Sequence, residues 1–238
     1  MTTFVLVHGA FHGAWSWYKL IPILREAGCS VIVDDLPGHG RRAMHGEDCS
    51  LEAYAQSVCA VIDKADEPVI LVGHSMGGAV ISQAAEWRSD KISKLVYIAA
   101  FLLGDGQTIR DFSKPDAKSA LYDNVDWSPD RQFATLRDDK FGEAFCHDGS
   151  HADSVLGGLL SMPEPMAPPM EAVHISPEDF GGIARCYVEC ANDRALNSET
   201  QRAMHAATPC EQVFKLNAAH SPMLSQPEAL AEVLLKLR

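Results

Sequence analysis

The sequence predicts an α/β protein with a doubly wound, mostly parallel sheet and a cap inserted into the chain. Short, continuous apolar runs recur, as is typical of parallel strands that are buried on both faces. Amphipathic helical patterns lie between these runs, so strand and helix alternate as they do in doubly wound sheets. The alternation stops over residues 104–182 and then resumes, which predicts a cap inserted within one domain that spans residues 1–238.

The strands are predicted from apolar runs rich in β-branched and aromatic residues. In chain order they are Phe4–Val7, Val31–Val33, Val69–Val72, Lys94–Phe101, Cys186–Cys190 and Gln212–Leu216.

The helices are predicted from apolar residues that recur at helical spacing. Leu51, Tyr54, Ala55, Val58 and Ile62 form one apolar stripe after Ser50, a residue type favoured as an N-cap. The other predicted helices are Trp17–Ala27, Ala79–Trp87, Glu199–Ala207 and one that opens at Pro227, since proline is favoured in the first helical turn.

The predicted cap has little strand signal and several polar turns. It contains Met162–Met170, a stretch rich in methionine and proline. Thioether side chains fill irregular shapes, so this stretch fits an adaptable apolar lip over a pocket. A surface loop is an equal alternative.

Composition excludes several classes of protein. The 238 residues are 47% hydrophobic and 22% charged, which is typical of one soluble globular domain and not of a disordered chain, a collagen or a coiled coil. The net charge of −12 disfavours nucleic acid and anionic membrane as partners. Seven cysteines without a CxxC pair favour reduced thiols over a disulfide framework or a zinc site. Since the first residues also lack a secretion signal and no run has membrane-spanning length, we expect a cytoplasmic protein.

Gly73-His74-Ser75-Met76-Gly77 matches the G-x-S-x-G pattern of a nucleophile elbow. The pattern lies between a predicted strand and a predicted helix, where such an elbow requires it. Small residues on both sides of the serine allow the sharp turn to pack against its neighbours. Ser75 is therefore the predicted nucleophile.

A serine hydroxyl needs a base, and the base needs an acid that holds its tautomer. His220 follows the last predicted strand, where the chain order serine, acid, histidine places the base. Asp193, just past the strand that ends at Cys190, is the predicted acid, and Asp105 is the alternative. Glu189 lies within the strand and is expected to face packed residues.

An oxyanion that forms on attack needs two backbone N–H donors. The residue after the nucleophile, Met76, supplies one. The loop that follows the first strand, His8–Gly13, supplies the other, with Ala10 the expected donor. Its glycines allow the backbone to approach a substrate closely.

Four segments resemble the alpha/beta-hydrolase superfamily, and within it the branch of plant methyl esterases, polyneuridine aldehyde esterase and hydroxynitrile lyases. They are Phe4–Tyr18, Val69–Gly78, Ala99–Phe101 and the histidine loop 219–227. The resemblance implies that Ser75, Asp193 and His220 are the triad and that the amides of Ala10 and Met76 form the oxyanion hole.

The chain departs from this branch in two respects. Residues 34–40 are closer to the corresponding loop of bacterial hydrolases. The lyases carry a threonine where this chain has Gly9 and a lysine where it has Ser221. We therefore expect a serine carboxylesterase that acts on a small, apolar ester and needs no metal or organic cofactor. A hydroxynitrile lyase and a non-catalytic small-molecule receptor are the alternatives, and a homodimer is left open.

Overall fold

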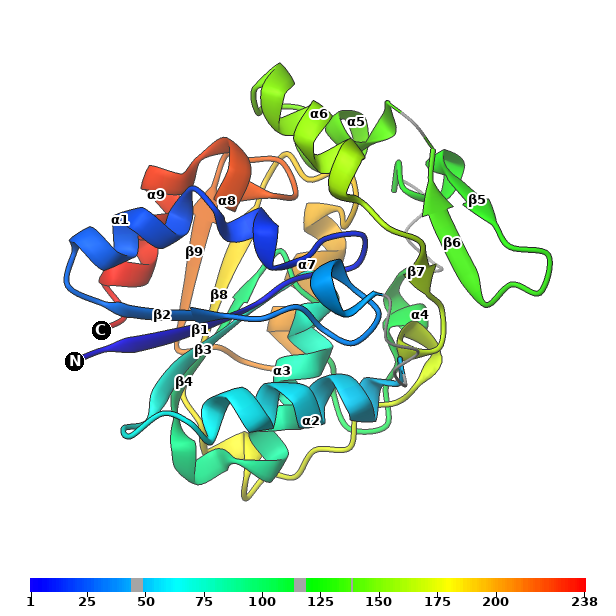
Figure 1. Ribbon diagram of the computed structural model, residues 1–238. Helices are drawn as coiled ribbons and strands as arrows, with labels where there is room; N and C mark the ends of the chain where they lie inside the picture. The colour runs from blue at the N-terminus through cyan, green and yellow to red at the C-terminus, as the bar shows by residue number, and fades with distance from the viewer. Residues whose placement is uncertain (44–48, 114–118, 138) are drawn as a thin grey trace.

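The computed structural model describes residues 1–43, 49–113, 119–137 and 139–238. These residues form a central sheet of six parallel strands in the order β2-β1-β3-β4-β8-β9 (Figure 1). The strands are β1 (Thr3–Val7), β2 (Ser30–Val33), β3 (Val69–His74), β4 (Ile92–Ile98), β8 (Arg185–Cys190) and β9 (Gln212–Leu216). The predicted fold class is confirmed.

Helices cover both faces of this sheet (Figure 1). One face packs against α1 and α9, and the other packs against α2 and α3. The helices outside the predicted cap are α1 (Leu20–Glu26), α2 (Leu51–Ile62), α3 (Gly77–Trp87), α7 (Ser198–Ala207), α8 (Pro222–Ser225) and α9 (Pro227–Leu235), with short 3-10 turns η1 (Ala14–Trp17), η2 (Gly40–Arg42) and η3 (Ser89–Lys91).

Strand β1 shows why the predicted runs are apolar at every position. Val5 and Val7 belong to the hydrophobic core that includes α2 and α3. Phe4 and Leu6 belong to the core that includes α1 and α9. Because successive side chains of a strand point to opposite faces, a sheet covered on both faces buries all of them.

Two predicted helices differ in how they begin. Helix α2 starts at Leu51 as predicted, and Ser50 Oγ accepts a hydrogen bond from the Ala53 amide at 3.1 Å. The helix predicted at 17–27 is instead divided into η1 and α1. Pro22 explains the division, since its ring would collide with the carbonyl of Tyr18 in a continuous helix.

The fourth strand is shorter than the predicted 94–101. It ends at Ile98, because Ala99 has a φ of 42° and turns the chain away from the sheet. The Phe101 amide then donates to the Ser75 carbonyl at 3.0 Å. The end of β4 therefore packs against the turn that carries Ser75.

The stretch between β4 and β8 contains the segment predicted as a cap, and its boundaries, 104 and 182, stay a prediction. Residues 114–118 and 138 of that segment lie outside the described residues. Its elements are α4 (Ile109–Ser113), η4 (Tyr122–Asn124), β5 (Val125–Trp127), β6 (Phe133–Leu136), α5 (Lys140–Phe145), α6 (His151–Leu160), β7 (Glu164–Pro165), η5 (Pro168–Met170) and η6 (Phe180–Gly182).

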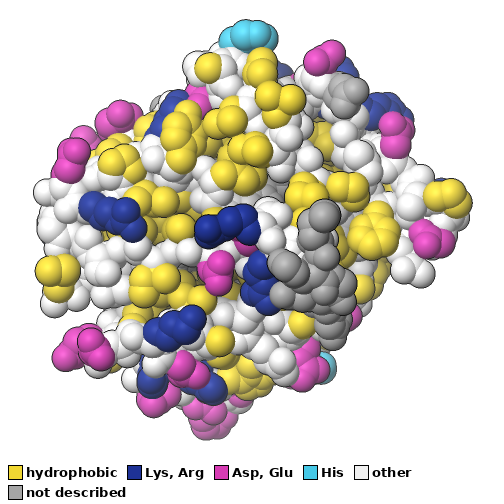
Figure 2. All heavy atoms as spheres, viewed as in Figure 1, with side chains coloured by type: hydrophobic (Ala, Val, Ile, Leu, Met, Phe, Trp, Pro, Cys, Tyr) yellow, Lys and Arg dark blue, Asp and Glu magenta, His cyan; other side chains and the backbone are white. Residues whose placement is uncertain are grey.

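The expectation of little strand structure in this segment was wrong in one respect. Strands β5, β6 and β7 form a small antiparallel sheet. They are two to four residues long, too short for an alternating pattern to show in the sequence. Hydrophobic side chains reach the surface in this part of the molecule (Figure 2), and Trp127 and Phe133 are 36% and 42% exposed.

Candidate active site

Ser75 lies at a sharp turn between β3 and α3. Its φ of 54° is in the left-handed region, which is strained for a residue other than glycine. The turn closes tightly: a Cβ at Gly73 would lie 2.6 Å from the Gly77 carbonyl oxygen, and one at Gly78 would lie 2.6 Å from the Phe101 carbonyl oxygen. Only glycine at these positions lets strand and helix meet at this angle, with Ser75 at the apex.

His220 and Asp193 come from two neighbouring strand ends. Nδ1 of His220, in the loop after β9, lies 2.7 Å from Oδ2 of Asp193, in the turn after β8. Both side chains are buried. The other oxygen, Oδ1 of Asp193, accepts hydrogen bonds from the amides of Ala195 (2.8 Å) and Leu196 (2.9 Å). These bonds fix the orientation of the carboxyl group, with Oδ2 facing His220.

The two other acidic candidates point elsewhere. Asp105 accepts a hydrogen bond from the Ile175 amide at 3.1 Å at an exposed site. Glu189 is buried within β8 and forms an ion pair with Arg202 at 2.6 Å. The structure therefore brings Asp193, and neither Asp105 nor Glu189, to His220.

Gln201 is a residue of this site that the sequence analysis missed. Its Nε2 donates to Oδ2 of Asp193 at 3.0 Å and to the Leu196 carbonyl at 2.7 Å. Its Oε1 accepts from the Cys190 amide at 3.0 Å. The side chain, on α7, is fully buried with Met204 one turn later. A glutamine on the apolar face of the predicted helix 199–207 was the available signal.

Two neutral histidines support the loops of the site. His74 Nε2 donates to the His220 carbonyl at 2.9 Å, and burial, with the neighbouring His220 and His12, holds the pKa of His74 well below its ordinary value. His12 Nδ1 donates to the Ala10 carbonyl at 2.7 Å, while Nε2 is 3.0 Å from Ser221 Oγ. Burial lowers the pKa of His12 to about 3. Both histidines therefore act as neutral hydrogen-bonding groups that hold the loops around Ser75 and His220.

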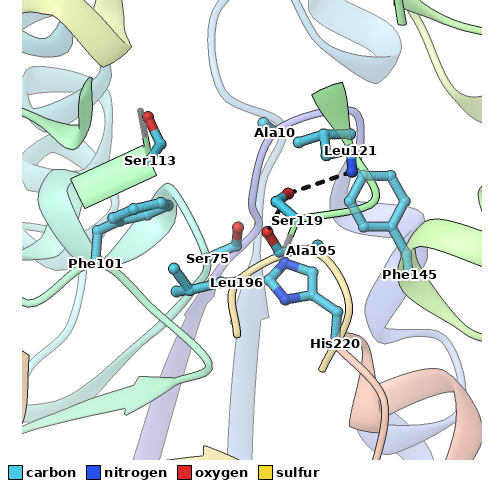
Figure 3. A pocket seen from close by; sticks show the side chains of 10 residues that line it. All are labelled: Ala10, Ser75, Phe101, Ser113, Ser119, Leu121, Phe145, Ala195, Leu196 and His220. Carbon is cyan, nitrogen blue, oxygen red and sulfur yellow. Dashed lines mark hydrogen bonds between the residues drawn. The ribbon is translucent and has the colours of Figure 1, made fainter. Parts of the chain in front are cut away.

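Ser75 and His220 line one small pocket (Figure 3). Its volume is about 50 Å³. The other lining side chains are mainly apolar: Ala10, Phe101, Leu121, Phe145, Ala195 and Leu196, with Ser113 and Ser119. Ser113 also lines a larger cavity of about 530 Å³, whose other lining residues are Arg110, Trp127, Arg131, Met166, Pro169 and Met170. A small apolar group fits beside Ser75, and Ser113 lies on the wall of both cavities.

Ala10 and Met76, the predicted oxyanion donors, lie beside the serine. Among the hydrogen bonds of the described residues, neither amide has a protein acceptor. Gly9 allows the backbone of the loop after β1 to come close to Ser75, since a Cβ at Gly9 would lie 2.6 Å from Cβ of Ser75. The loop after β1 therefore passes directly over the nucleophile elbow.

Two other kinds of feature are absent from the described part of the chain. Over these residues no three His, Cys, Asp or Glu side chains are grouped as a metal site needs. Within the same ranges no helix is both long enough and apolar enough to cross a bilayer.

Comparison with known proteins places this fold and site in a family. A model of the alpha/beta hydrolase family matches residues 4–233. Methylesterase 12 of Arabidopsis thaliana, a chloroplastic protein whose name marks its activity as provisional, is 35% identical over 98% of this chain and 71% of its own length. Methylesterase 7 of the same plant is 32% identical over 98% of this chain and 95% of its own length. The crystal structure of a pyrethroid hydrolase from Sphingobium faniae is 27% identical, covers 99% of this chain and 96% of its own, and gives a TM-score of 0.88. This chain belongs to the alpha/beta hydrolase family.

Proposed function

We propose that the protein is a serine carboxylesterase that cleaves small, apolar esters through an acyl-enzyme on Ser75. One observation carries the proposal: Ser75 and His220 line the same pocket, and His220 is paired at 2.7 Å with the buried Asp193. A nucleophile, a base and an orienting acid are the three groups that acyl transfer through serine needs.

Each residue then has a defined step. His220 Nε2 removes the proton of Ser75 as Oγ attacks the ester carbonyl carbon. Asp193 holds the Nδ1–H tautomer and stabilises the imidazolium that forms. The amides of Ala10 and Met76 donate to the oxyanion. His220 returns the proton to the leaving alcohol, and water activated by the same histidine then releases the acid. This chemistry needs no metal or organic cofactor.

The size and polarity of the pocket favour a small substrate. About 50 Å³ holds only a few heavy atoms next to Ser75, and the walls are largely apolar. Two relatives are named methylesterases. We therefore assign methyl esters of apolar acids as the first substrates to test, with the acid part extending past Ser113 into the larger cavity.

A panel of esters tests this proposal. Methyl, ethyl and aryl esters with acyl groups of graded length are assayed with the protein and with Ser75→Ala, together with a thioester and a lactone. Turnover should fall by several orders of magnitude in Ser75→Ala, because only binding and oxyanion effects remain. A serine-directed phosphonate should label Ser75. Near-native turnover by the folded variant would refute the assignment.

The same assays separate the alternatives. A cyanohydrin lyase would release cyanide from mandelonitrile, which we expect to be negligible because Gly9 offers no hydroxyl and Ser221 offers no cation. Cyanide release faster than hydrolysis of any ester, and dependent on Ser75, would favour the lyase. A receptor with a hydrolase fold would turn over no ester of the panel. A homodimer and a cytoplasmic location stay predictions.

A further inference from the structure

Glu164 lies in the Met/Pro-rich stretch of the predicted cap, and the proposed mechanism does not use it. It belongs to β7 and is 1% exposed. Its Oε2 accepts hydrogen bonds from the Phe11 amide at 2.6 Å and from Nε2 of His39 at 2.9 Å. Its Oε1 is buried and has no partner among the described residues. A buried carboxylate that leaves one oxygen unpaired is a poor device for stability alone.

The partner histidine, His39, is held between two oxygen atoms. Both ring nitrogens of His39 face acceptors, since Nδ1 lies 3.0 Å from the Pro37 carbonyl and Nε2 faces Glu164. A ring that donates from both nitrogens is the imidazolium. Burial opposes this charge, but the carboxylate of Glu164 outweighs it, so that the pKa of His39 is raised. Glu164 is thus a buried acceptor for the Phe11 amide and the partner of His39.

Phe11 directly follows Ala10, the proposed oxyanion donor, and has a left-handed φ of 60°. The planar peptide that joins these residues is held at both ends: His12 donates to its carbonyl, and Glu164 accepts from its N–H. The Gly9 carbonyl, one peptide earlier, accepts from His8 Nδ1 at 2.9 Å. Because the Gly9 carbonyl and the peptide between Ala10 and Phe11 are both held, the Ala10 amide has little freedom to turn away from the pocket.

We propose that Glu164 is a positioning residue for the oxyanion hole: by holding the Phe11 amide, it keeps the Ala10 amide aimed at the developing oxyanion. The cap then contributes to the rate of the reaction as well as to the shape of the pocket. This inference rests on the proposed esterase function.

The test compares Glu164 with Glu171, the residue that directly follows the Met/Pro-rich stretch. Glu171 also accepts a backbone amide at 2.6 Å, that of Leu51 at the start of α2, and it does not line the pocket of Ser75. Glu164→Leu and Glu171→Leu therefore remove the same kind of bond from two places. Glu164→Gln keeps an oxygen for the Phe11 amide, and Glu164→Asp keeps the carboxyl group but withdraws it by one methylene.

We measure kcat and KM for the methyl ester that the panel finds best, and thermal unfolding for each variant. Glu164→Leu and Glu164→Asp should lower kcat about tenfold to a hundredfold, less than the full loss of an oxyanion donor, with KM unchanged within about twofold. Glu164→Gln should recover most of kcat, and Glu171→Leu should keep wild-type kcat. If Glu164→Leu does not fold, Glu164→Asp gives the decision.

Three results would overturn the inference: wild-type kcat in a folded Glu164→Leu or Glu164→Asp, an equal loss in Glu171→Leu, or no recovery in Glu164→Gln. Its failure is distinct from failure of the esterase proposal. If Ser75→Ala abolishes turnover while the Glu164 variants are unaffected, the esterase proposal stands and only the positioning role is lost.

Discussion

Mild acid should destabilise this fold strongly, because three buried histidines are held neutral in it. His8, His12 and His74 are at most 3% exposed. Burial is the first cause that lowers the pKa of each one, to about 3 for His12 and well below the ordinary value for His8 and His74. The contacts require the neutral form of His8 as well, since its Nε2 accepts from the Leu36 amide at 3.0 Å.

The sign and size of the effect follow from proton linkage. When the chain unfolds, each of the three rings regains a pKa near 6.5 and takes up a proton that the folded state does not bind. Stability therefore falls as the pH falls below about 6.5, by up to about 1.4 kcal/mol per pH unit for each ring. Between pH 7 and 5.5 the three rings together lose roughly 4 kcal/mol of stability, a large share of the 5 to 15 kcal/mol typical of a domain.

His39 acts in the opposite direction. Its pKa is raised in the folded state, so its stabilising contribution is fully present below the unfolded pKa and is lost as the pH rises through the folded pKa. On acidification it offsets up to about 1 kcal/mol of the loss. The expected net loss of stability between pH 7 and 5.5 is therefore about 3 to 4 kcal/mol.

Urea unfolding at several pH values between 7 and 5.5 measures this change directly. His12→Gln should reduce this loss of stability by about one third, because a glutamine at position 12 takes up no proton when the chain unfolds. His151→Gln, at an exposed position on α6, is the matched control and should leave the pH dependence unchanged. A free energy of unfolding that stays constant within about 1 kcal/mol over this interval would refute the reasoning.

Three further predictions concern the proposed site. Asp193→Asn should lower ester turnover about 10⁴-fold while Asp105→Asn stays near wild type; the reverse pattern would show that the acid was misassigned. Gln201→Leu should lower kcat, because Asp193 then has one hydrogen-bond donor fewer. It should also lower the free energy of unfolding in urea by about 2 kcal/mol, because buried backbone groups are left unpaired. A variant with wild-type kcat would limit this residue to a structural role. Gly9→Thr should abolish turnover, since the threonine Cβ would lie 2.6 Å from Cβ of Ser75. Phosphonate labelling of Ser75 should slow in parallel. Unchanged labelling would contradict the close approach of the loop after β1 to Ser75.

The sequence predicted most of the sheet because strands that are buried on both faces are continuous apolar runs, which can be recognised locally. Strand β9 has the predicted bounds, and α2 begins directly after the predicted N-cap residue, Ser50. The same reasoning failed for β5, β6 and β7, since strands of two to four residues carry no periodicity. The end of β4 was misplaced because a tertiary contact, from the Phe101 amide to the Ser75 carbonyl, bends an apolar segment that the sequence alone predicts to continue.

The sequence by itself determined which residues could do the chemistry. Strand, glycines and helix around Ser75 are adjacent in the chain, and the order of serine, acid and histidine is a linear property. Only the tertiary structure showed that Asp193, and not Asp105, lies beside His220, because this depends on which strand ends meet there. It alone revealed Gln201 and Glu164, whose partners lie up to 153 positions away in sequence. Hydrogen-bond partners of buried polar groups are fixed by the packing of distant segments, and no local pattern encodes them.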